Sequence, residues 1–348
     1  MRMTVLSLAA LAASTSWSGM AAEAGFRTTS SLPPRKVIVG TSMQALWGAY
    51  PGLANRLKQL TGMVDRMAEQ SQAKYGRGLD LALLPEMAVN GEISSPAGAF
   101  PFEGPVKDAF AASAREHHCY ILVPMYLLED KARNIAYNAG VLVGRNGETV
   151  GIYRKVHPAV PVNQDKLEAG MTPGKEFPVF ECDFGKLGVQ ICYDINFEDG
   201  WKELARKGAD LVAWPTQSPQ TAQPASRAML NRYYIVSSTW RNNASIFEPT
   251  GKIVAQIREP EQTLVQELDL SYAIVPWSSD LKNGAAFKTK FGDKVGFRYY
   301  EDEDLGIFWS NDPKTTIRQM VLSVGTAEVD EELLRVRKYF DKLGAPRF

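Results

Sequence analysis

Apolar positions along this chain follow two patterns, short continuous runs and longer stretches with helical spacing. Short apolar runs bounded by turn-forming residues are typical of buried strands, whereas apolar residues at i, i+3 and i+4 indicate amphipathic helices. The runs predict strands at about 36–42, 79–84, 119–127, 136–144, 148–153, 187–191, 209–213, 233–238, 243–248, 252–257 and 263–269. The helical spacing predicts helices at about 53–74, 104–117, 198–207 and 223–231.

Turn signals join several of these strands directly. Asn146-Gly147 is a strong signal for a hairpin turn, and Pro249-Thr250-Gly251 makes another turn between apolar runs. Mixed βα units and hairpins predict an α/β fold in which two sheets are covered by helices. The 348 residues are enough for two domains, although α/β folds of this size often form one.

One cysteine stands where a predicted strand hands over to a predicted helix. Cys192 follows the apolar run 187–191 and precedes the helical segment 198–206, which has acidic residues in its first turn. A nucleophile on such a turn lies close to backbone N–H groups that can hold an oxyanion, and a nearby helix N-terminus favours a thiolate. The alternative is a small buried cysteine that ends a core strand.

Two ionisable residues also follow apolar strands. Glu86 directly follows the apolar segment Leu79–Pro85. Partial burial at this position would raise its pKa and suit it to proton transfer near neutral pH. Lys155 ends the strand 151–154, where it could stabilise negative charge on a tetrahedral intermediate. Taken singly, Glu86 is equally compatible with a solvated loop residue, and Lys155 alone is better explained as a solvated residue at a strand end.

The three segments together resemble the nitrilase, or carbon–nitrogen hydrolase, superfamily. The matching motifs occur in the family's order: LLPEM around Glu86, GIYRKVHP around Lys155 and GVQICYDINFED around Cys192. The segments GADLVAWPTQSP, NRYYIVSS and NASIFEPTGKIVAQ extend the resemblance, which runs from about Arg35 to Leu270. The chain departs from the family at Phe-Glu-Asp after the cysteine, where many members have Phe-Pro-Glu, and it matches nothing beyond Leu270.

The resemblance implies a four-layer α-β-β-α sandwich that pairs into homodimers, and it implies roles for individual residues. Cys192 would attack an amide-type carbon, Glu86 would act as general base, and Lys155 with the backbone N–H of Tyr193 would hold the oxyanion. Members also use a second glutamate between the lysine and the cysteine; Glu168 is the first candidate and Glu176 the second. The expected reaction hydrolyses a non-peptide C–N bond in a small amide or N-carbamoyl compound through a cysteine thioester, releasing ammonia or an amine.

Substrate selectivity is indicated by the residues after the cysteine. Tyr193-Asp194 resembles the amidase and N-carbamoyl amidohydrolase branches, whereas true nitrilases typically have Trp-Glu there. The residues expected to line the pocket are Met87, Tyr193, Asn196, Trp214 and Thr216. Three arginines are available for a substrate carboxylate without being assigned to one: Arg227, Arg232 and Arg241.

Several alternatives remain open. A Cys–His pair would need His157, or the His117-His118 pair at the end of a predicted helix, near Cys192. The same scaffold could serve an N-acyltransferase or a nitrilase, and a catalytically silent binding protein is the remaining class. No cysteine or histidine cluster has metal-ligand spacing, so neither metal nor cofactor is expected.

Charge and the chain ends complete the prediction. Lysine plus arginine equals aspartate plus glutamate at 39 each, which gives no electrostatic footprint for nucleic acid or an anionic membrane. Residues 1–24 have the pattern of a secretory signal peptide, with an apolar run and an Ala-Glu-Ala cleavage site, and they predict an exported, periplasmic or secreted protein. The alternative is a cytoplasmic enzyme with an N-terminal extension.

Residues 25–34 are predicted to be a linker and 35–270 the hydrolase domain. Residues 271–348 form an extension, with an amphipathic helix at about 328–343, that packs on the core or on a partner subunit.

Overall fold

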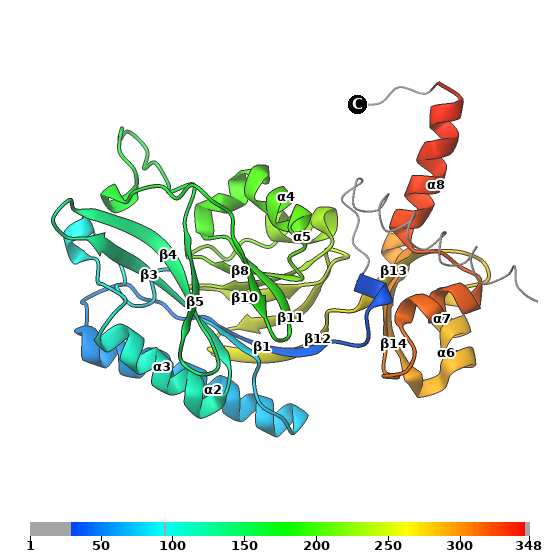
Figure 1. Cartoon of the computed structure of the whole chain (residues 1–348), viewed down its shortest axis with the longest axis horizontal. Helices are drawn as coiled ribbons and strands as arrows, with labels where there is room; N and C mark the ends of the chain where they lie inside the picture. Colours follow the sequence, from blue (N-terminus) through cyan, green and yellow to red (C-terminus); the bar gives the residue numbers. More distant parts are fainter. Residues whose placement is uncertain (1–28, 94, 345–348) are drawn as a thin grey trace, which may run out of the picture. The chain divides into compact units, whose positions relative to one another are not determined.

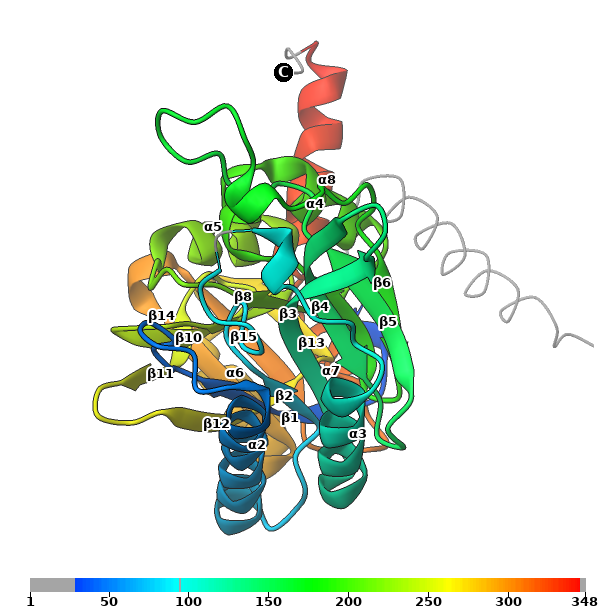
Figure 2. The same ribbon diagram turned by 90° about the vertical axis from the view of Figure 1, so that its left-hand side faces the viewer.

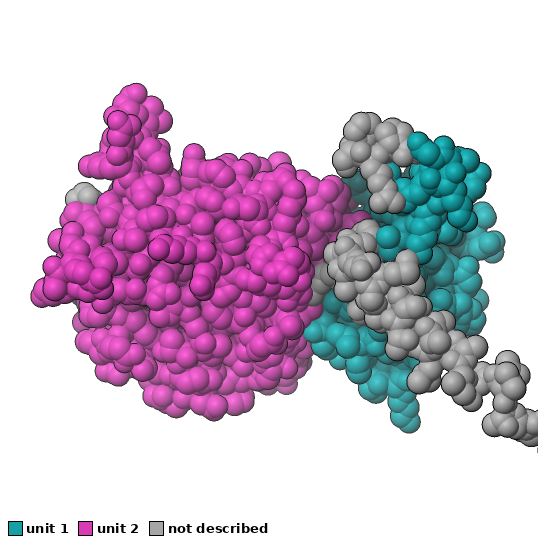
Figure 3. Space-filling view, turned by 45° about the horizontal axis from the view of Figure 1, so that its top comes forward, with its two compact units in different colours: residues 1–35, 269–348 teal, residues 36–268 magenta. Residues whose placement is uncertain are grey.

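The computed structural model describes residues 29–93 and 95–344 of the chain. The predicted signal peptide therefore lies outside the described residues. The chain divides into two compact units, one of residues 36–268 and one that combines residues up to 35 with residues from 269 onward (Figure 3). Across the residues described, no helix has both the length and the apolar character that crossing a bilayer requires.

Two six-stranded sheets form the larger unit. The first has the order β12-β1-β2-β3-β4-β5 and the second the order β11-β10-β9-β8-β7-β6. The strands of the first sheet are β1 (Lys36–Ser42), β2 (Leu81–Leu83), β3 (Tyr120–Asp130), β4 (Ile135–Val143), β5 (Thr149–Arg154) and β12 (Thr263–Asp269). Those of the second are β6 (Val179–Cys182), β7 (Gly185–Val189), β8 (Leu211–Pro215), β9 (Tyr234–Ser238), β10 (Asn243–Phe247) and β11 (Ile253–Arg258).

Helices cover the outer face of each sheet. Helices α2 (Leu53–Tyr75) and α3 (Pro105–His117) lie side by side on the first sheet, and α4 (Glu198–Arg206) and α5 (Ala222–Asn231) lie on the second (Figures 1 and 2). The inner faces of the two sheets meet directly: the Thr41 hydroxyl donates to the Ser237 carbonyl at 2.6 Å. The layer order is α-β-β-α, which confirms the predicted fold class.

Every strand and helix predicted for the larger unit is present, with ends that shift by a few residues. The strand β6 was not predicted, and β3 continues to Asp130, past its predicted end. Helix α4 begins at Glu198 as expected, so the departure from the family's Phe-Pro-Glu does not displace it.

The smaller unit has its own sheet and core. Its strands β13 (Tyr272–Pro276), β15 (Leu305–Ser310) and β14 (Val295–Tyr300) pair in that order, and the helices α6 (Ala285–Phe291) and α7 (Ile317–Val324) pack on them around Phe287. The aromatic residues of this unit, Phe297, Tyr299, Tyr300, Phe308 and Trp309, lie on β14 and β15, which the sequence patterns did not predict. Helix α8 (Val329–Lys342) matches the predicted amphipathic helix. Of the predicted linker, Thr29 and Ser30 are buried in this unit.

Candidate active site

Glu86 is held at the carboxyl end of β2 by a buried turn. Leu84-Pro85 carries the chain out of the strand, and Met87 takes a left-handed conformation with φ 55°. The indole N–H of Trp240 donates to the Glu86 backbone carbonyl at 2.8 Å. Only 1% of Glu86 is exposed, so the carboxylate lies inside the protein and cannot be a solvated loop residue.

Lys155 follows β5 and is fully buried. Its Nζ lies 3.1 Å from Glu86 Oε1 and 2.8 Å from Glu168 Oε1. Glu168 begins a short 3-10 helix (Glu168–Gly170), and its Oε2 accepts a hydrogen bond from the Ala159 backbone N–H at 3.0 Å. The second candidate, Glu176, instead lines a surface hollow.

Asn138 on β4 joins the two glutamates and was not predicted from the sequence. Its Nδ2 donates to Glu86 Oε1 at 2.8 Å and to Glu168 Oε1 at 2.9 Å. With Lys155, it therefore occupies Glu86 Oε1. The other oxygen, Glu86 Oε2, is buried and has no hydrogen-bond partner among the residues described.

Burial and charge perturb the acid–base properties of this cluster in opposite directions. Burial raises the pKa of Glu86, the nearby Lys155 cation lowers it, and the negative charge of Glu168 raises it again. Burial by itself would lower the pKa of Lys155, but the two carboxylates raise it well above the ordinary value. Lys155 therefore stays protonated at neutral pH.

Cys192 starts a tight turn three residues after the end of β7, behind Gln190 and Ile191. It opens a short 3-10 helix (Cys192–Asn196) with φ 42°, a left-handed conformation that is rare outside glycine. The indole N–H of Trp214 donates to the Cys192 carbonyl at 3.1 Å. Burial and the charge of Glu86 raise the thiol pKa to about 12, although Lys155 and hydrogen bonds from the Thr216 side chain and the Gln217 backbone lower it. The resting group is a thiol.

The residues expected to line a pocket are distributed unevenly around Cys192. Thr216 is buried beside the thiol, and Met87 is buried in the turn after Glu86. Trp214 lies in the hydrophobic core beside the second sheet, and its indole N–H holds the Cys192 turn through the Cys192 carbonyl. Tyr193 is 39% exposed, and Asn196 is exposed with its Nδ2 donating to the Tyr193 carbonyl at 3.2 Å.

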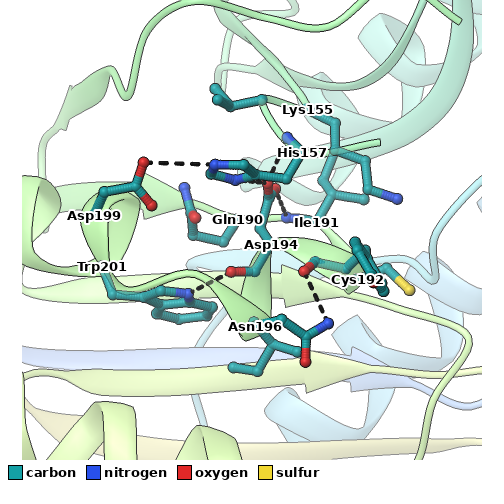
Figure 4. Close-up of polar contacts among 12 residues, drawn as sticks. Lys155, His157, Gln190, Ile191, Cys192, Asp194, Asn196, Asp199 and Trp201 are labelled. Carbon is teal, nitrogen blue, oxygen red and sulfur yellow. Dashed lines mark hydrogen bonds and ion pairs between the residues drawn. The ribbon is translucent and has the colours of Figure 1, made fainter. Parts of the chain in front are cut away.

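The histidines have other partners. His157 Nδ1 lies 3.0 Å from Asp194 Oδ1, its ring stacks on Phe197, and Figure 4 shows the Cys192 sulfur pointing away from it. His117 contacts Asp65 at 2.7 Å, and His118 caps α3. The described part of the chain contains no group of three or more His, Cys, Asp or Glu residues that could hold a metal ion. The site therefore combines a thiol, a buried carboxylate with one free oxygen, and a permanent cation.

Sequence comparison relates the chain to known enzymes. The Carbon-nitrogen hydrolase family matches residues 45–275. A probable nitrilase of Schizosaccharomyces pombe is 27% identical over 234 residues, which cover 61% of this chain and 81% of that protein. An omega-amidase of Xenopus laevis is 28% identical over 221 residues, covering 56% of this chain and 79% of that protein.

Solved structures share the fold. Nit3 of Saccharomyces cerevisiae, a member of branch 10 of the nitrilase superfamily, superposes with a TM-score of 0.59 at 21% identity, covering 68% of this chain and 90% of that one. An amidase from Nesterenkonia sp. gives a TM-score of 0.56 at 19% identity, covering 69% of this chain and 92% of that one. At these identities the likeness concerns the fold.

Proposed function

The chain belongs to the carbon–nitrogen hydrolase family, and we propose that it hydrolyses a non-peptide C–N bond in a small amide or N-carbamoyl compound through a thioester on Cys192. This proposal rests on the buried cluster in which Lys155 contacts Glu86 and Glu168. The charges of Glu86 and Lys155 also shift the pKa of the Cys192 thiol, in opposite directions. Relatives named nitrilase and omega-amidase support the reaction class.

In the first half of the reaction, the free oxygen Glu86 Oε2 takes the proton of the Cys192 thiol as the sulfur attacks the carbonyl carbon. The oxygen becomes an oxyanion, held by the Lys155 ammonium and the backbone N–H of Tyr193. Protonated Glu86 then gives its proton to the leaving nitrogen. The C–N bond breaks, ammonia or an amine departs, and the acyl group remains on sulfur.

In the second half, water replaces the amine. Glu86, again a carboxylate, takes a proton from the water as its oxygen attacks the thioester carbon, and the same donors hold the second oxyanion. The C–S bond breaks, the sulfur recovers a proton from Glu86, and a carboxylic acid leaves. Glu168 takes no proton in this scheme; together with Asn138 it holds Lys155 and Glu86 in place.

The test is cysteine-dependent ammonia release. The purified protein should release ammonia from at least one member of a panel of monoamides of dicarboxylic acids, aliphatic amides, N-carbamoyl amino acids and nitriles. Cys192→Ala should abolish release with the fold intact. The matched control is Cys182→Ala, which removes the other partly exposed thiol and should leave release unchanged.

Each other outcome has a defined reading. Release from nitriles alone would assign a nitrilase. A hydroxamate formed in the presence of hydroxylamine, without free acid, would assign an N-acyltransferase. Release that survives Cys192→Ala would contradict the proposed function.

A further inference from the structure

The carboxylate of Asp194 lies between the segments that carry Lys155 and Cys192 (Figure 4). Its Oδ2 accepts hydrogen bonds from the backbone N–H of Ile191 and from the hydroxyl of Tyr153, each at 2.8 Å. Its Oδ1 accepts from the backbone N–H of His157 and lies 3.0 Å from His157 Nδ1. Asp194 is fully buried, and both of its oxygens are occupied.

These donors flank the reacting groups along the chain. Ile191 directly precedes Cys192, whereas Tyr153 and His157 stand two residues before and two residues after Lys155. The Asp194 carboxylate therefore accepts hydrogen bonds from residues on both sides of Lys155 and from the residue before Cys192. A rigid connection of this kind sets the separation of the Lys155 ammonium from the Cys192 sulfur, and catalysis depends on such separations to about an ångström.

The cysteine turn needs such support because its backbone is strained. Cys192 is held at φ 42°, in the left-handed region that is unfavourable for a residue with a side chain. The turn is closed by the Asp194 backbone N–H, which donates to the Ile191 carbonyl at 3.0 Å. From the other side, the indole N–H of Trp201 donates to the Asp194 carbonyl at 3.0 Å.

His157 balances the buried charge of Asp194. Its ring is stacked on Phe197 with centroids 4.1 Å apart, and its Nε2 faces Asp199 Oδ2 at 3.5 Å. The hydrogen bond to Asp194 raises the pKa of His157, although burial lowers it. The hydrogen bonds that Asp194 accepts compensate part of the cost of removing its carboxylate from water.

We propose that Asp194, held by His157 and Tyr153, is a positioning residue that fixes Lys155 relative to Cys192. The inference rests on the proposed function, because positioning has meaning only if these two groups react together. Asp194 takes no proton in the reaction, since both oxygens already accept hydrogen bonds. The same contacts give His157 a role without requiring a Cys–His pair.

The test is the Asp194→Asn variant. Asparagine keeps the volume but turns an amide NH₂ towards donors that need an acceptor. We expect kcat to fall about a hundredfold with KM within threefold of wild type. We also expect the acidic limb of kcat/KM to move to higher pH, because Lys155 lowers the pKa of Glu86 and would be displaced from it. Loss of folded protein alone lowers the apparent kcat but leaves the acidic limb in place, so the shift of the limb separates positioning from instability.

The matched control is Asp199→Asn, which removes the exposed carboxylate that also faces His157 and should leave kcat and the pH profile unchanged. Tyr153→Phe removes a single donor to Asp194 and should lower kcat three- to tenfold with the same shift of the limb. If Asp194→Asn does not fold, the kinetics of Tyr153→Phe alone test the positioning role of Asp194. A kcat within twofold of wild type in Tyr153→Phe, or in a folded Asp194→Asn, overturns the positioning role.

Failure of the proposed function is distinguishable from failure of this inference. If the wild-type protein releases no ammonia from any compound, the function fails first, and positioning is measured instead by the rate at which iodoacetamide alkylates Cys192 at pH 8. Folded Asp194→Asn should then react at least fivefold more slowly than wild type and Asp199→Asn. An unchanged rate overturns the inference.

Discussion

At the scale of single residues, the cluster holds one buried cation between two carboxylates, so its charges do not cancel. Lys155 contacts Glu86 and Glu168 within 3.1 Å, and Asn138 adds a neutral donor to both. The second carboxylate raises the pKa of the first, because two negative charges in a low-dielectric site repel one another. Glu168 thereby makes Glu86 a stronger base while it holds the lysine.

This arrangement predicts a shift in the pH profile of Glu168→Gln. Removing the negative charge lowers the pKa of Glu86, and the reaction needs Glu86 ionised. Activity that is lost as pH falls should therefore be lost at a lower pH than in wild type, while kcat on the plateau falls about tenfold or more. The measurement is kcat/KM between pH 4 and 9. Glu176→Gln is the matched control, and an unchanged acidic limb in Glu168→Gln would rule out this role of Glu168.

The side chains that we propose to react could be singled out from the sequence, whereas most of the residues that contact them could not. Glu86, Lys155 and Cys192 follow apolar strands and carry family motifs, so both pattern and resemblance pointed to them. Asn138 and Tyr153 lie within strand segments, where an inward polar side chain shows only that it needs a partner. Which partner it finds depends on the neighbouring strands, and that information is not local.

At the scale of elements, the position of Lys155 depends on a close approach between β5 and the loop that follows Glu168. The Gly174 backbone N–H donates to the Lys155 carbonyl at 2.8 Å. A Cβ at Gly174 would lie 2.1 Å from the Arg154 carbonyl oxygen, which belongs to the backbone and cannot move aside alone. Glycine is required here by space, because only the bare backbone fits against the end of the strand.

The Gly174→Ala variant should therefore push the loop away from β5 and disturb Lys155. We expect a loss of about 1–3 kcal/mol in the free energy of unfolding, which is usual for overpacking, and at least a tenfold loss of kcat. Denaturant unfolding and ammonia release provide the measurements. Gly78→Ala is the control, since a Cβ at Gly78 meets no atom within 4 Å. Equal behaviour of the two variants would contradict the account of this loop.

Elements with a clear period or a continuous apolar run were predictable, whereas β6, β14 and β15 were not. The amphipathic helices α2 and α3 and the long apolar strands appear where the pattern placed them. The strand β6 (Val179–Cys182) is short and has an exposed glutamate in its middle, so it lacks the continuous apolar run that revealed the similarly short β2. The strands β14 and β15 pair with each other and with β13, and that pairing is invisible in the aromatic pattern alone.

At the scale of the whole molecule, the family match and the structural division do not coincide. The match ends at residue 275, inside β13, so most of the smaller unit lies outside it. The inferred chemistry needs only residues of the larger unit, since Glu86, Lys155, Glu168, Asp194 and Cys192 all fall within 36–268. Dimerisation and the packing of residues 271–348 stay predictions, testable by light scattering of the full chain and of a chain ending at Leu270.

Export also belongs to this scale. The apolar run and Ala22-Glu23-Ala24 motif predict removal of residues 1–24 during secretion. N-terminal sequencing of the protein from the extracytoplasmic fraction of expressing cells should then begin at Gly25. A protein that stays in the cytoplasm with Met1 intact would favour the N-terminal extension instead.

The thioester on Cys192 can be observed by intact-mass spectrometry of enzyme that is quenched in acid within milliseconds of mixing with an amide that it turns over. We expect an added mass equal to the substrate minus ammonia, mapped to the peptide that contains Cys192 and absent from Cys192→Ala. Turnover at the wild-type rate by Cys192→Ala, or an acyl adduct on any other residue, would contradict it.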